Sequence, residues 1–153
     1  MGFACYAAAM SAAAEADSFR DWRVECRDAP VASCILSTTS GAEDSTWLAT
    51  MRLATEPGDR AVVQLLLPPG IHLASGAFVE VAGVDRAPAR LLRCLPQACE
   101  AQLALDPRAM AAWKAGRAAA VTYRPGVEAP PIRFEMSLLG LTAALDHADE
   151  RLR

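Results

Sequence analysis

Residues 19–34 read Phe-Arg-Asp-Trp-Arg-Val-Glu-Cys-Arg-Asp-Ala-Pro-Val-Ala-Ser-Cys. Within this stretch Trp22, Val24 and Cys26 alternate with charged residues. Alternation with period two is typical of a strand that buries one face. A second cysteine, Cys34, follows after seven intervening residues. We therefore expect a strand that turns back on itself, with the two cysteines in position to staple a hairpin or a bulged turn.

The same alternation recurs along the rest of the chain, with turn-forming residues roughly every 8–12 positions. Residues 61–67, Ala-Val-Val-Gln-Leu-Leu-Leu, are more continuously apolar and predict a strand buried on both faces. Regularly spaced short strands predict an all-β, antiparallel β-sandwich. The expected strands are residues 22–26, 47–53, 61–67, 79–81, 90–94, 101–105, 118–123 and 132–138.

One helix is predicted over about 106–115. Asp106 is suited to cap it, Pro107 to begin it, and Gly116 to end it. Residues 139–152 are expected to form a final helix or a frayed end.

Composition limits the function classes. The chain has 153 residues, of which 53% are hydrophobic, and a formal net charge of −3. This length and apolar content suit one compact domain. The acidic balance argues against nucleic acid as a partner, because nucleic acid recruits clusters of Lys and Arg. No apolar run in the sequence reaches the ~18–20 residues of a membrane span.

The first residues resemble the end of an export signal. Residues 1–16 contain a short, uncharged, small-residue stretch, which predicts a signal-peptide remnant cleaved near Ala14 or Ala16. A signal peptide opens with Lys or Arg, whereas the first basic residue here is Arg20. Either the start codon is placed too late, or the segment is an Ala-rich helical tail. The export reading leaves residues 17–153 as a single mature domain.

The cysteines support the export reading. Cys5 lies inside the signal-like segment and would be absent from the mature protein; a lipid-anchored Cys5 is a weaker alternative. The remaining four allow three connectivities. Their spacing favours local pairing as structural disulfides, each stabilising the fold by roughly 2–3 kcal/mol in the chain-entropy model. Disulfides persist in oxidising compartments, so a periplasmic or secreted location is expected. The two local pairs are Cys26 with Cys34 and Cys94 with Cys99.

Two chemical roles compete with structural disulfides. A redox-active dithiol at Cys94 and Cys99 would need a thiolate of lowered pKa, and such sites favour a two-residue spacing at a helix N-terminus. Four residues separate these cysteines, between strand-like runs. A four-cysteine zinc site usually spaces ligands by two to four residues in both halves, which the Cys26 and Cys34 pair does not fit.

Catalytic, metal and cofactor motifs are not evident in the sequence. His72 follows a Pro-Pro-Gly turn and His147 lies in the polar C-terminal tail, without further metal ligands at recognisable spacing. The adjacent carboxylates at 43–44 and 149–150 lie in turn-like or terminal surroundings typical of solvated surface. We therefore expect no catalytic residue, no metal and no cofactor.

Arginines alternate along several strands, at Arg23, Arg52 and Arg133. Such residues usually form a solvated face. The alternative is a shallow face that binds anions.

The order of these features resembles the invasion-associated locus B family of bacterial exported proteins. Residues 19–26 resemble its aromatic-x-x-Trp-x-x-x-Cys opening, and Cys34 its second cysteine. Residues 66–71, Leu-Leu-Pro-Pro-Gly-Ile, resemble its Leu-Pro-x-Gly turn. Residues 94–99 resemble its second cysteine pair, and residues 137–144, Ser-Leu-Leu-Gly-Leu-Thr-Ala-Ala, its closing signature.

The resemblance covers about residues 19–146 and departs from the family pattern at two positions. Ala98 stands where the family often has Gly before the last cysteine, and Leu141 where an aromatic is common. The resemblance implies an immunoglobulin-like β-sandwich, exported across the inner membrane, with the four cysteines as structural staples. It implies no catalytic residues.

Together these observations predict a non-enzymatic binding module of the bacterial envelope or the extracellular space. Its partner would be a protein, an envelope component or a host surface, with a role in host-cell interaction in pathogenic relatives. The alternative function is a thiol redox protein or sensor that uses Cys94 and Cys99.

Overall fold

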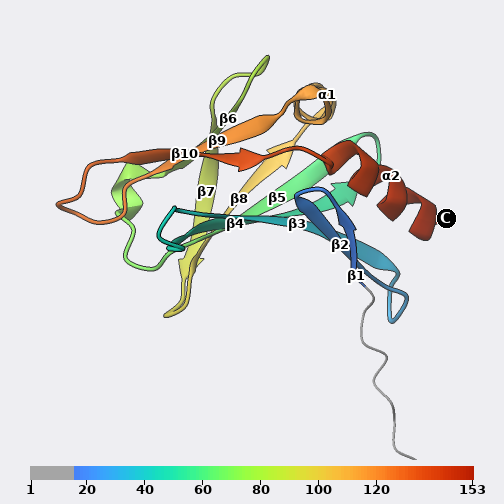
Figure 1. Cartoon of the computed structure of the whole chain (residues 1–153), viewed down its shortest axis with the longest axis horizontal. Coiled ribbons are helices and arrows are strands. Elements are labelled where there is room, and N and C mark those ends of the chain that lie inside the picture. The colour runs from blue at the N-terminus through green and yellow to red at the C-terminus, as the bar shows by residue number, and fades with distance from the viewer. Residues whose placement is uncertain (1–15) are drawn as a thin grey trace, which may run out of the picture.

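A computed structural model describes residues 16–153 of the chain (Figure 1). The predicted signal-peptide remnant, residues 1–16, lies outside the described residues except for Ala16, which begins the first strand.

The described chain folds into ten strands, two α-helices and one short 3-10 turn at Leu73–Ser75. The strands are β1 (Ala16–Phe19), β2 (Trp22–Arg27), β3 (Ser33–Gly41), β4 (Trp47–Glu56), β5 (Arg60–Leu67), β6 (Ala77–Val81), β7 (Ala87–Cys94), β8 (Cys99–Leu105), β9 (Ala118–Tyr123) and β10 (Ile132–Ser137). The helices are α1 (Pro107–Ala115) and α2 (Leu141–Arg151).

All ten strands join one antiparallel sheet in the order β1-β2-β3-β4-β5-β8-β7-β6-β9-β10. Strand β7 belongs to both halves, because residues 87–89 pair with β6 and residues 90–94 pair with β8. The sheet curls at this strand, so the two layers of the predicted sandwich are halves of one sheet (Figure 1). The all-β antiparallel class is confirmed.

Side-chain hydrogen bonds hold the two ends of the curled sheet together. The Tyr123 hydroxyl donates to the Leu48 carbonyl over 2.9 Å, and the Ser40 hydroxyl to the Glu135 carbonyl over 3.4 Å. Burial raises the pKa of Tyr123, which keeps its phenol protonated as a donor. The last strands therefore lie against the first ones and enclose the core.

Both segments expected to be helical are helices, and capping chemistry explains where α1 begins. Asp106 accepts a hydrogen bond from the Ala109 backbone N–H over 2.7 Å at the start of α1, as an N-cap should. The C-terminal segment, predicted as a helix or a frayed end, is helix α2. Its residues Leu141, Ala144, Leu145 and Ala148 are buried, and it packs on β1, β2 and β3.

Hydrogen bonds join the β1–β2 turn to the β10–α2 junction, and we call this contact the clasp. The Ser137 hydroxyl donates to the Asp21 carboxylate and accepts from the Leu139 N–H, while the Asp21 N–H donates to the Leu139 carbonyl. The Trp22 indole donates to the Ser137 carbonyl over 3.1 Å. The two stretches that resemble the family's opening and closing motifs therefore form one structural contact, although 115 positions separate Trp22 from Ser137.

The structure corrects one expectation about the strands. Residues 61–67 were predicted to form a strand buried on both faces. In β5 only Ala61, Val63, Leu65 and Leu67 are buried, whereas Val62, Gln64 and Leu66 are half-buried on the opposite face. Val62 and Gln64 line a surface groove, so this strand is buried on one face only although its sequence is typical of a strand buried on both.

Candidate functional site

The outer face of the sheet carries a continuous row of polar side chains. Antiparallel pairing places Arg23 opposite Ser37, and Ser37 opposite Arg52. The row continues through Gln64 and Gln102 to Arg90. The row therefore crosses β2, β3, β4, β5, β8 and β7. We call the outer surface of these six strands the six-strand face. The inward neighbours on the same strands, such as Val24, Leu53 and Val63, fill the core.

A groove of about 770 Å³ runs across this face. Its floor combines polar side chains with an apolar strip, in which Ala54 opposes Val62. Ile35 adds to the strip from β3, and Leu92, 43% exposed, lines the groove from β7. A second hollow of about 480 Å³, which also includes Val62 and Gln102, continues past Arg90 where β7 leaves β8. The groove is lined by Glu25, Cys26, Arg27, Ile35, Ser37, Thr50, Arg52, Leu53, Ala54, Val62, Gln64, Leu92 and Gln102.

The charges on the six-strand face are unevenly paired. Arg93 binds Glu100 through two hydrogen bonds of 2.8 and 3.1 Å, which lower the pKa of Glu100 and raise that of Arg93. Arg23 lies 3.7 Å from Glu25. Among residues 16–153, Arg52 and Arg90 form no salt bridge. The guanidinium groups of Arg52 and Arg90 are therefore available to an anionic partner, as are those of Arg27 and Arg60 on the same face, which form no salt bridge among the described residues either.

Two disulfides hold the strands at either side of the face. Cys26 and Cys34 are direct antiparallel partners on β2 and β3, with Cα atoms 4.1 Å apart. Cys94 and Cys99 are direct partners on β7 and β8, with Cα atoms 3.9 Å apart. The pairing in the structure is the local one. Each bridge joins an outermost strand of the six-strand face to its neighbour.

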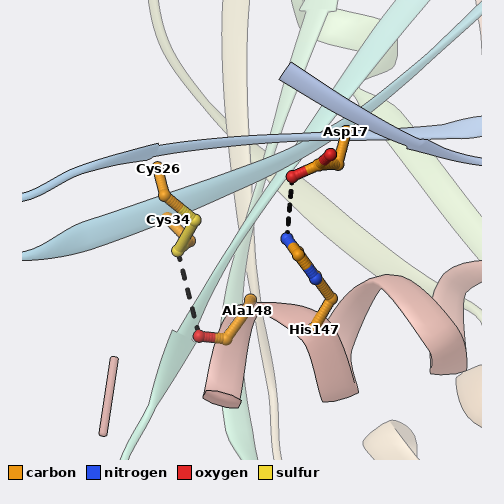
Figure 2. Close-up of a disulfide and its surroundings, with 5 residues drawn as sticks. All are labelled: Asp17, Cys26, Cys34, His147 and Ala148. Atoms are coloured by element: carbon orange, nitrogen blue, oxygen red, sulfur yellow. Dashed lines mark hydrogen bonds and ion pairs between the residues drawn. A yellow bond between two sulfur atoms is a disulfide. The ribbon is translucent and has the colours of Figure 1, made fainter. Parts of the chain in front are cut away.

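The two disulfides differ in their surroundings. Cys34 is 5% exposed, and its Sγ lies 3.9 Å from the Ala148 carbonyl of α2 (Figure 2). Figure 2 also shows His147 of the same helix reaching Asp17 on β1, over 2.9 Å between Nε2 and Oδ2. Strands and helix therefore cover the Cys34 sulfur, while Cys26 is half-buried at the edge of the groove. The second lies at a hairpin where Cys99 is buried but Cys94 is exposed.

This difference predicts the order of reduction. Thiol attack on a disulfide depends on access to a sulfur atom. In folded protein treated with dithiothreitol, we expect Cys94 and Cys99 to be alkylated before Cys26 and Cys34, as followed over time by peptide mass spectrometry. In urea the order should disappear, because shielding by α2 is lost. Earlier labelling of Cys26 and Cys34 in the folded protein would contradict the prediction.

The structure does not bring the candidate catalytic groups together. His72 Nδ1 lies 2.6 Å from the Ser75 hydroxyl, at the short 3-10 turn. His147 is on α2, paired with Asp17 and packed on the Phe19 ring at 5.0 Å. The Asp44 carboxylate accepts from the Thr46 N–H, which lowers the pKa of Asp44. Across residues 16–153, no three His, Cys, Asp or Glu side chains are grouped to hold a metal ion.

The arginines singled out in the sequence do not share one face. Arg23 and Arg52 lie in the polar row, but Arg133 is on β10 and lies 3.7 Å from Glu80 of β6. Sequence reasoning missed Gln64, Gln102 and Arg90. The signal for Gln64 was a lone polar residue within an apolar run.

No helix within residues 16–153 is both long and apolar enough to cross a membrane.

Two sequence comparisons and one structural comparison relate this chain to known proteins. The sequence model of the family described as "Invasion associated locus B (IalB) protein" matches residues 22–149. The chain is 30% identical over 132 residues to invasion protein B homologs of Brucella abortus strain 2308 and of biovar 1 strain 9-941. In each case the match covers 85% of this chain and 76% of the relative.

A solved structure shares the fold. The crystal structure of invasion associated protein B from Bartonella henselae matches with a TM-score of 0.79 and 16% sequence identity. It covers 89% of this chain and 95% of that one. With the family match over most of its length, the chain belongs to the invasion associated locus B family.

Proposed function

We propose that this protein is an exported, disulfide-stabilised, non-enzymatic binding module of the bacterial envelope or the extracellular space. One observation carries the proposal. A broad face with a groove crosses six strands, and a disulfide joins the two strands at each of its sides. Cross-linked strands keep such a face in one shape, which lowers the ordering cost of binding.

Support for export comes from the cysteine chemistry. Disulfides persist in the periplasm and outside the cell and are rare where thiols are kept reduced. In the proposal residues 1–16 are a signal-peptide remnant whose removal takes Cys5 away. Residues 17–153 then form a single mature domain, and all four of its cysteines are paired.

Support for a binding role comes from the kind of surface that the groove offers. Its lining mixes guanidinium, amide and aliphatic groups without a histidine, and its Glu25 carboxylate lies beside Arg23. Such a surface recognises a partner by shape, charge and hydrogen bonds. The Brucella relatives are named as invasion protein B homologs, which favours an envelope or host-surface component as the partner.

The test is the intact mass of the protein recovered from the periplasm and the medium of the bacterium that produces it. The sample is alkylated under denaturing conditions without reductant. We expect a mass that begins near Asp17 with no alkyl group added. The same sample alkylated after reduction serves as the control and should gain four alkyl groups.

Two outcomes would overturn the proposal. A cytoplasmic protein that keeps residues 1–16 would remove the export step. Recovered protein with free thiols at Cys94 and Cys99, active in a thiol-reduction assay with insulin, would point instead to the redox function.

A further inference from the structure

We infer that the groove of the six-strand face binds an extended, acidic segment of a partner protein, about seven residues long, laid across the strands. The inference rests on the proposed function and names the class of partner for that same face. The length of the groove, the charge of the face and the hydrogen-bonding groups along it support this inference.

The length follows from sheet geometry. The groove runs from β2, which supplies Glu25 and Arg27, to Leu92 of β7. Neighbouring strands lie about 4.8 Å apart, so five spacings span roughly 24 Å. An extended chain advances about 3.3–3.6 Å per residue, so about seven residues fill that span.

The charge follows from the register of the strands. Alternation places six arginines on the six-strand face against three glutamates, although the chain as a whole carries −3. Two of the glutamates, Glu25 and Glu100, already lie beside Arg23 and Arg93. The face is therefore a locally positive surface on an acidic protein, and a partner of opposite charge complements it. The arginines are Arg23, Arg27, Arg52, Arg60, Arg90 and Arg93, and the glutamates are Glu25, Glu56 and Glu100.

The hydrogen-bonding groups favour a polypeptide. A chain that crosses the strands cannot add to the sheet as another strand, because the backbone groups of inner strands are already paired. Its own peptide groups must then bond to side chains. Gln64 and Gln102 stand directly opposite each other at the centre of the row, and each amide carries both donors and an acceptor.

The apolar strip beside the row sets a further preference. Ala54, Val62 and Leu92 provide aliphatic contact for small apolar side chains between the acidic ones. No aromatic ring lines the groove, which disfavours a single-stranded nucleic acid, whose bases stack on such rings.

The experiment measures binding of a fluorescein-labelled peptide, Glu-Ala-Glu-Val-Glu-Ala-Glu, to the oxidised protein by fluorescence anisotropy. The probe with every Glu replaced by Lys is the charge control. We expect the acidic probe to bind and the basic probe not to bind. Raising the salt concentration from about 20 to 150 mM should weaken binding, because the exposed charges become screened.

Variants locate the site. The double variant Arg52→Glu and Arg90→Glu should raise Kd by about tenfold or more, because two attractive contacts become repulsive. Gln64→Ala should raise it by a few-fold. Arg52→Glu alone should raise Kd several-fold, and Arg133→Glu is its matched control: it makes the same single charge reversal at an exposed strand position outside the face and should leave Kd within about twofold.

The outcomes separate the inference from the proposed function. No binding of the acidic probe by protein with both disulfides intact overturns the inference and leaves the binding module standing. Equal loss in Arg133→Glu and in Arg52→Glu also overturns it, since the attraction would then come from overall charge. Tight binding of heparin or polyphosphate that the acidic probe cannot displace would show that the face binds a different anionic polymer, which also overturns the inference.

Discussion

Gly140→Ala is expected to lower the free energy of unfolding by about 3–5 kcal/mol, through backbone strain and a steric clash together. Gly140 has φ +94°, a conformation that a residue with a Cβ resists. An added Cβ would lie 2.8 Å from the carbonyl carbon of Phe19 and closer still to its oxygen. These are backbone atoms of the β1–β2 turn, so they cannot move aside without opening the clasp.

Urea unfolding of the oxidised protein, followed by far-UV circular dichroism, measures the effect. Gly83→Ala is the matched control. Gly83 has φ +90°, but no atom lies within 4 Å of its added Cβ. It should therefore show only the conformational cost, about 1–2 kcal/mol. Equal losses of unfolding free energy in the two variants would show that the clash with Phe19 does not contribute to the destabilisation.

Trp22→Ala is expected to cost about 3–5 kcal/mol, as for other large aromatic deletions from a core. The Trp22 side chain is among the largest of the fully buried ones, with 1% exposure. Its indole N–H also donates to the Ser137 carbonyl at the clasp. The substitution thus leaves a cavity and removes a hydrogen bond that joins β2 to the end of β10.

Two further variants separate these contributions. Trp22→Phe keeps most of the ring but leaves the carbonyl without its donor, so a smaller loss of about 1–3 kcal/mol is expected. Trp47→Ala deletes the same side chain from a half-buried position, where the indole bonds to the Thr50 hydroxyl. It should cost less than half as much as Trp22→Ala. A comparable loss at Trp47 would contradict the assignment of Trp22 as the core anchor.

Local patterns were enough to predict much of the fold. The alternation of Trp22, Val24 and Cys26 predicted β2, because a strand with one buried face repeats every two residues. Asp106 and Pro107 predicted the start of α1, because capping depends on groups a few residues apart. The family resemblance rested on the order of such short motifs.

Local patterns did not predict the groove or the clasp. Gln64 reads as an interruption in an apolar run until Gln102, which follows 38 positions later, is paired against it. Gly140 is one residue of the closing signature in the sequence, and only the structure shows Phe19 lying against it. Neither partner can be recognised from spacing alone.

The sequence by itself therefore determined eight of the ten strands, helix α1 and the family of this protein, because periodicity and capping act within a few residues. It listed no strand at β1 or β3 and left α2 open as a helix or a frayed end. The tertiary structure alone decided which side chains form the polar row and which residues Ser137 and Gly140 contact. Those relationships depend on strand register and on the curl of the sheet, which bring residues from distant parts of the chain into contact.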